Sequence, residues 1–344
     1  MFYEVQKADT PRLTTAYYHA GRSGLPKLML IHGNASSAKF YLPLMKRLED
    51  RFEMVAPDLR SFGDTEPKPI DARRGMRDFS DDVDALAETL GWERFSLLGW
   101  SMGGGVAMQY AIDHSEKLES LILEAPLSPF GFGGTYDADG KKLEPVGLAS
   151  GGGCANAQLI ACLQSGERSF IAQTIDSVYV APPYQIDPEL KEMFIDSVLS
   201  THVGEGLYPG DKTAAPVWPF FAAGENGVCN TMAPNYCDLS PIADIPLKPP
   251  ILWIRGASDI MVSDTSMMDL AWLGQLGYVP GWPGAESCPP QPMLSQTRFV
   301  LDRYQANGGR CKEVVIAGGH GPMLDNEDGF IAELLQFFDE QEAQ

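Results

Sequence analysis

Short apolar runs alternate with amphipathic stretches over the first 128 residues. Four of these runs are five to seven residues long, which suits buried strands and is too short for an ordinary helix. Between them the apolar residues recur at helical spacing, for example after Ser80, which we expect to cap a helix, and over 103–114. Strands separated by helices predict a parallel sheet with helices on both faces. The predicted strands are 27–32, 54–58, 95–99 and 118–124.

The pattern changes after Pro126. Residues 129–245 are rich in glycine, proline and aromatic side chains, and helical spacing is confined to 156–173 and 187–200. This composition indicates an inserted, mostly helical lid rather than a continuation of the sheet.

The alternating pattern then returns, with strand-like runs at 250–255 and 313–317 and an amphipathic helix at 329–341. We therefore predict one α/β core built from 1–128 and 246–344. Within its second part we expect an extra excursion at about 262–310, forming a helical pair beside the candidate site.

The composition of the chain limits which binding partners and cellular location we expect. The formal net charge of −20 disfavours nucleic acid and anionic membranes, both of which recruit clustered Lys and Arg. We see no export signal and no apolar run long enough to span a membrane, so we expect a cytoplasmic protein. The six cysteines form no C-x-x-C pair, which predicts free thiols and no metal. Self-association is left open.

The strongest motif is Gly99-Trp-Ser-Met-Gly103, which matches G-x-S-x-G. It follows a predicted strand and opens a predicted helix, and this context is what the motif requires. The sharp turn would present the hydroxyl of Ser101 at the carboxyl edge of the sheet, while a Cβ at Gly99 or Gly103 would collide with the neighbouring strand and helix. Ser101 is therefore our candidate nucleophile.

A serine nucleophile needs a base, and a carboxylate that orients the base. His320 follows the last predicted strand between small residues, and we choose it among the five histidines. His32, at the end of an earlier strand, is expected to shape the neighbouring loop. Asp259 follows the strand at 250–255 and is our preferred acid, with Glu124 as the alternative.

Acyl transfer also needs donors for the oxyanion. We expect the backbone N–H groups of Met102, after the nucleophile, and of Asn34, in the loop after the first predicted strand of the parallel series. Aromatic and methionine side chains of the lid and the excursion are candidates for the substrate wall. These wall candidates are Tyr179, Tyr184, Trp218, Phe220, Phe221, Met261 and Trp272.

Taken together, these motifs resemble the α/β-hydrolase superfamily, and in particular its lid-bearing members. The resemblance covers about 25–128 and 248–340 and implies an eight-stranded, mostly parallel sheet with a lid after the sixth strand. The residues that carry it are His32-Gly-Asn, Asp58-Leu-Arg-Ser-Phe-Gly, Gly99-Trp-Ser-Met-Gly-Gly-Gly, Arg255-Gly-Ala-Ser-Asp and Gly318-Gly-His-Gly-Pro.

The resemblance implies a cofactor-free serine hydrolase that cleaves an apolar carboxylic ester or lactone of moderate size through an acyl-enzyme. The His-Gly-Asn loop is similar to that of haloalkane dehalogenases, and the layout also suits epoxide hydrolases. Both carry aspartate where this chain has Ser101, so we reject both activities. Three alternatives stay open: a C–C hydrolase acting on a diketone, a perhydrolase, and a non-catalytic ligand-binding protein.

Overall fold

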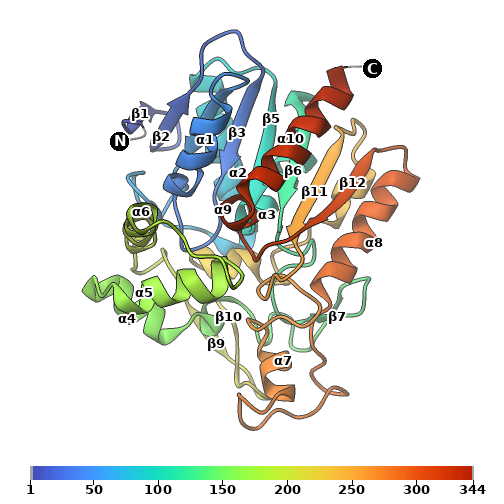
Figure 1. Cartoon of the computed structure of the whole chain (residues 1–344). Coiled ribbons are helices and arrows are strands. Elements are labelled where there is room, and N and C mark those ends of the chain that lie inside the picture. The colour runs from blue at the N-terminus through green and yellow to red at the C-terminus, as the bar shows by residue number, and fades with distance from the viewer. Residues whose placement is uncertain (1–2, 343–344) are drawn as a thin grey trace.

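Eight strands form one sheet in the order β1-β2-β4-β3-β5-β6-β11-β12 in the computed structural model, which describes residues 3–342. Only β2 runs against its neighbours, and all the other pairings, from β4 to β12, are parallel. The mostly parallel α/β sheet predicted from the sequence is thus present (Figure 1). The strands are β1 (Gln6–Asp9), β2 (Thr14–Ala20), β3 (Lys27–Ile31), β4 (Glu53–Pro57), β5 (Phe95–Trp100), β6 (Leu118–Glu124), β11 (Ile251–Gly256) and β12 (Cys311–Ile316).

Helices cover both faces of this sheet (Figure 1). On one face, α1 (Leu42–Leu48) is joined to α10 (Glu327–Glu342) by ion pairs of Arg47 with the start of α10. On the other face, α2 (Arg77–Thr89) packs beside α3 (Met102–His114). A parallel sheet buried on both faces needs apolar strands, and all six residues of β5 are buried.

Ser80 does not cap α2, contrary to expectation. The helix begins four residues earlier, at Arg77 with Met76 as its N-cap, and Ser80 lies inside it as a buried residue. The helix is preceded by a 3₁₀ turn at Ala72–Arg74 and by Gly75, which has a positive φ of 59°. These residues direct the chain so that the helix starts earlier than expected. Local capping preference was overridden by the path of the preceding loop.

Between β6 and β11 the chain leaves the sheet. Helical spacing at 156–173 predicted one helix, but Gly166 (φ 74°) ends the first helix and a second begins at Ser169. A π-helical turn, Ile175–Tyr179, follows directly. The remaining elements here are α4 (Ala157–Ser165), α5 (Ser169–Thr174), α6 (Pro188–Leu199), and two hairpins, β7 (Thr135–Tyr136) with β8 (Lys141–Lys142) and β9 (Lys212–Ala214) with β10 (Phe221–Ala223). We refer to residues 129–245 as the lid.

The excursion between β11 and β12 carries α7 (Leu270–Gln275) and α8 (Met293–Ala306). Buried amide side chains join it to the start of the lid: Gln291 donates to the carbonyl of Gly131, and Gln296 accepts from the hydroxyl of Ser128. The indole of Trp218 in the lid donates to the carbonyl of Pro280. The excursion and the lid therefore pack against each other.

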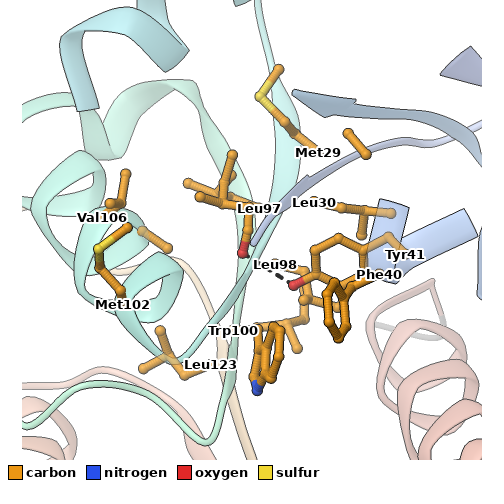
Figure 2. Packing of buried hydrophobic residues seen from close by; sticks show 14 of the residues in the cluster. Met29, Leu30, Phe40, Tyr41, Leu97, Leu98, Trp100, Met102, Val106 and Leu123 are labelled. Atoms are coloured by element: carbon orange, nitrogen blue, oxygen red, sulfur yellow. Dashed lines mark hydrogen bonds between the residues drawn. The ribbon is translucent and has the colours of Figure 1, made fainter. Parts of the chain in front are cut away.

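The core is centred on β3 and β5, where aliphatic side chains meet the aromatic rings of Phe40, Tyr41 and Trp100 (Figure 2). The hydroxyl of Tyr41 donates to the carbonyl of Ile31 at 3.1 Å, which satisfies a buried polar group at the end of β3. This packing fixes the carboxyl ends of β3 and β5, from which two loops of the candidate site depart. No helix within residues 3–342 is long and apolar enough to cross a bilayer.

Candidate active site

Ser101 occupies the turn between β5 and α3 with φ 57° and ψ −118°, a conformation that L-residues rarely adopt. The neighbouring glycines make the turn sterically feasible. A Cβ on Gly99 would lie 2.2 Å from the carbonyl oxygen of Gly103, and one on Gly103 would lie 2.2 Å from that of Ile31. The backbone N–H of Ser101 donates to the carbonyl of Glu124 at 2.9 Å, which ties the turn to β6. The strained turn is held by the sheet itself.

His320 and Asp259 meet although they are 61 residues apart. The Nδ1 of His320 lies 2.9 Å from Oδ2 of Asp259, and both side chains are almost fully buried. The other oxygen of Asp259 accepts from the backbone N–H groups of Met261 and Val262. Because Asp259 occupies Nδ1, the Nε2 of His320 is left for proton transfer.

His320 also sits directly beside the serine turn. Its backbone carbonyl accepts a hydrogen bond from the indole N–H of Trp100 at 2.8 Å, and the two rings are 5.6 Å apart. Trp100 precedes Ser101 in sequence, and both Ser101 and His320 line one cavity. The structure thus brings Ser101, Asp259 and His320 together at the carboxyl edge of the sheet.

Glu124, the alternative acid, has a different partner. Its Oε1 accepts from the backbone N–H of Met323 at 3.1 Å, and its Oε2 has no hydrogen-bond partner among the described residues. Complete burial raises the pKa of Glu124 to about 8, with a smaller contribution from Asp325. Glu124 therefore supports the loop that carries His320, and does not pair with the imidazole.

The loop after β3 approaches Ser101 closely. A Cβ on Gly33 would lie 3.1 Å from the Cβ of Ser101, so only glycine allows this approach without displacement. Asn34 and Met102, the two expected donor residues, both line the cavity. Met102 is the first residue of α3, where backbone N–H groups have no acceptor within the helix.

His32, just before this loop, is a structural residue. Burial lowers its pKa to about 4, so the ring is neutral. Its Nε2 accepts from the backbone N–H of Leu59, and its Nδ1 lies 2.8 Å from the carbonyl oxygen of Gly33. It links the loop after β4 to the loop after β3, in agreement with the expectation from the sequence.

The cavity beside Ser101 measures about 390 Å³. Apart from His320, its wall consists of apolar, sulfur-containing and neutral polar side chains, and no Lys, Arg, Asp or Glu is among the described residues that line it. Neutral polar groups at Asn156, Gln173 and Ser177 are exposed and mark its mouth. Sulfur atoms in the wall come from Cys154, Cys229, Met232, Met261 and Met268.

Only two of the seven wall residues expected from the sequence line this cavity, namely Tyr179 and Met261. The other five are corrections. Trp218 donates a hydrogen bond to the carbonyl of Pro280 and packs in a second, small apolar cluster. Phe220 is 65% exposed at the end of a hairpin. Tyr184, Phe221 and Trp272 also lie outside the cavity wall.

Sequence reasoning missed most of the wall, including Phe132, Leu159, Phe170 and Tyr208. Leu159 and Phe170 come from α4 and α5, where an apolar side chain facing the cavity has the same spacing as one facing the core. The pattern carried no signal that separates the two.

All six cysteines are free, as expected. Among residues 3–342 no group of three or more His, Cys, Asp or Glu side chains is arranged to hold a metal ion.

Comparison with known proteins identifies the fold. A family profile described as "alpha/beta hydrolase fold" matches residues 26–148. The soluble epoxide hydrolase of Corynebacterium sp. (strain C12) is 34% identical over 107 residues, or 31% of this chain and 36% of that protein. The chain thus matches only about a third of the length of that relative.

Two solved structures match almost the whole chain. The enol-lactonase from Burkholderia xenovorans LB400 aligns with a TM-score of 0.61 at 16% identity, covering 97% of this chain and 100% of that one. The carboxylesterase CesB from Bacillus subtilis aligns with a TM-score of 0.60 at 15% identity, covering 98% and 92%. The fold is the α/β-hydrolase fold. The family match covers residues 26–148, and the structural similarity extends the same fold over almost the whole chain.

Proposed function

We propose that this protein is a serine hydrolase that cleaves an uncharged carboxylic ester or lactone through an acyl-enzyme. The observation that carries the proposal is the bond between Asp259 and His320 beside the strained turn of Ser101. The nucleophile and the base line one cavity, and the acid bonds to the base from a third loop, as nucleophilic acyl transfer requires.

The reaction proceeds in two halves. The hydroxyl of Ser101 attacks the acyl carbon while Nε2 of His320 takes its proton, and the N–H groups of Met102 and Asn34 stabilise the oxyanion. His320 then protonates the leaving alkoxide, and the acyl-enzyme forms. Water, deprotonated by the same nitrogen, attacks the acyl carbon and releases the acid. Losing one oxyanion donor typically costs about 100-fold or more in rate.

The neutral wall supports an uncharged substrate. A carboxylate moved into this cavity would meet no cationic side chain among the described residues, and desolvating an unpaired ion costs several kcal/mol. The methionine and cysteine side chains are adaptable and polarizable, which suits apolar chains or rings of moderate size. An ester and a lactone fit this wall equally well.

The nature of the nucleophile separates this chain from the epoxide hydrolase that it partly matches. The turn Gly99-Trp-Ser-Met-Gly103 contains Ser101 and no carboxylate, so an alkyl–enzyme ester of the aspartate type cannot form there. A serine alkoxide is instead suited to acyl carbons.

The direct test uses nitrophenyl esters of two to eight acyl carbons and a panel of uncharged lactones. We expect turnover by the purified protein, covalent labelling by a fluorophosphonate probe, and loss of both in Ser101→Ala. Ser120→Ala, which removes a buried hydroxyl of β6 outside the cavity wall, is the matched control and should still be labelled. Turnover that persists in Ser101→Ala would contradict the mechanism, and absence of turnover and labelling would favour a binding protein.

A further inference from the structure

Tyr179 connects the lid to the loop that holds one oxyanion donor. It ends the π-helical turn Ile175–Tyr179, is 5% exposed and lines the cavity. Its hydroxyl donates to the carbonyl oxygen of Ala35 at 2.9 Å and lies 3.4 Å from that of Asn34. A side chain of the lid thus holds two consecutive carbonyl groups of the loop after β3.

That loop is strained and needs support. Ala35 adopts a φ of 47°, in the left-handed region that favours glycine. Its N–H is held by the side-chain oxygen of Asn34 at 3.0 Å, and its carbonyl by Tyr179. These two contacts oppose rotation of the peptide groups that follow Asn34 and Ala35, and so restrict the backbone immediately after the Asn34 N–H.

Packing holds the ring of Tyr179 in place, and burial keeps its hydroxyl protonated. The ring packs edge-on against Trp100 at 5.5 Å and lies 5.7 Å from Phe40. Burial raises the pKa of Tyr179 well above its ordinary value, so the hydroxyl remains a donor. A donor can bind only a carbonyl that faces it, which makes the contact selective for one orientation of the loop.

The backbone around Tyr179 also holds the histidine loop. The N–H of Gly321 donates to the carbonyl of Tyr179 at 2.7 Å. The carboxylate of Asp325 accepts from Gly319 and from Ala181 of the lid, both at 2.7 Å. The same short lid segment therefore contacts the residues on both sides of His320 as well as the loop of Asn34.

From these contacts we propose that Tyr179 is a positioning residue: its hydroxyl fixes the loop of Asn34 so that the backbone N–H points at the acyl oxygen on Ser101. Catalytic competence thereby depends on the lid as well as on the sheet. The inference rests on the proposed serine hydrolase function for its kinetic consequence, and on the loop geometry alone for its structural one.

The test compares Tyr179→Phe with Tyr304→Phe. The second variant is a matched control because Tyr304 is also buried and its hydroxyl also donates to a backbone carbonyl, that of Pro249, which lies just before β11 at the opposite edge of the sheet. Hydrogen exchange of the amides at 33–37 reports the loop whether or not the protein is an enzyme. We expect exchange there to be about tenfold faster in Tyr179→Phe and unchanged in Tyr304→Phe.

The second measurement separates oxyanion positioning from general damage. Butylboronic acid accepts an electron pair from Oγ of Ser101, whose proton passes to His320, and forms a tetrahedral anion that needs the donors. We expect its inhibition constant to rise about tenfold in Tyr179→Phe, while that of the uncharged methyl butyl ether changes less than twofold. For esters kcat should fall, with KM nearly constant.

Equal weakening of the boronic acid and the ether, or unchanged loop exchange in Tyr179→Phe, would overturn the inference. If wild type neither cleaves esters nor binds the boronic acid, the proposed function fails, and the exchange measurement still decides the role of Tyr179 in the loop. The two failures are therefore distinguishable.

Discussion

Asp259 accepts a hydrogen bond from Nδ1 of His320 at 2.9 Å, whereas Glu124 accepts one from the backbone N–H of Met323 in the same loop. Two buried carboxyl groups thus surround one loop, with one paired to the imidazole and the other to the backbone. The geometry predicts separate effects for the two groups.

Replacing the orienting acid should reduce the rate far more than replacing the supporting one. Asp259→Asn keeps the shape but removes the charge that stabilises the imidazolium, and we expect kcat to fall by about 10⁴-fold. Glu124→Gln should change kcat less than tenfold at pH 7, since a carboxyl group with a pKa of about 8 is mostly protonated there. Steady-state kinetics on one nitrophenyl ester decides this, and the reverse order of effects would make Glu124 the acid.

Glu124 should also give the stability a particular pH dependence. Burial raises its pKa from 4.5 to about 8, so as the pH rises the unfolded carboxyl loses its proton first. The contribution of protonated Glu124 is complete below about pH 4.5, and it is lost between there and pH 8, by at most about 1.4 kcal/mol per pH unit. Urea unfolding of wild type and Glu124→Gln across this range measures it. A difference between the two proteins that is independent of pH would contradict the assignment.

Charge in the cavity should control substrate choice. For an ester that carries a carboxylate, such as nitrophenyl hemisuccinate, we expect kcat/KM at least about 100-fold below that of nitrophenyl butyrate, because the ion is desolvated without a partner. Leu159→Arg, which adds a cation to the part of the cavity wall formed by α4, should reduce the ratio of kcat/KM for the butyrate to kcat/KM for the hemisuccinate by about tenfold or more. Leu159→Met is the neutral control and should leave the ratio unchanged. A ratio near one in wild type would refute the uncharged class.

The serine turn should tolerate no Cβ at Gly103. That atom would lie 2.2 Å from the carbonyl oxygen of Ile31, so Gly103→Ala must displace β3 from α3, and we expect a loss of about 3 kcal/mol or more in the free energy of unfolding. Gly105→Ala is the graded control in the same helix, because the closest contact of its Cβ would be a side-chain methyl group of Leu127 at 2.9 Å and not a backbone atom. It should cost about 1 kcal/mol or less, measured by thermal and urea unfolding. Similar losses in both variants would contradict the steric argument.

Much of the fold could be predicted from the sequence because its signals are local. Runs such as 95–99 are apolar throughout, and a strand buried on both faces allows little else. The motif around Ser101 combines strand, turn and helix within a few residues, so its geometry follows from sterics at Gly99 and Gly103. The start of α2 was misplaced at Ser80 because a distant loop, rather than a local cap, sets it.

The substrate wall could not be predicted in the same way. Trp218 and Trp272 are large and apolar, but the excursion and lid leave them outside the cavity, whereas Leu159 and Phe170 reach it from short lid helices. An apolar residue of a lid helix can face the cavity, the core or another part of the lid, and its spacing is the same in each case.

The sequence by itself determined the α/β sheet, the turn of Ser101 and the candidates for base and acid, since each depends on steric and polar properties of neighbouring residues. Only the tertiary structure decided that Asp259 rather than Glu124 pairs with His320, which side chains enclose the cavity, and that Tyr179 of the lid holds the loop of Asn34. These contacts join residues far apart in the chain, and their formation depends on how strands, lid and excursion pack together.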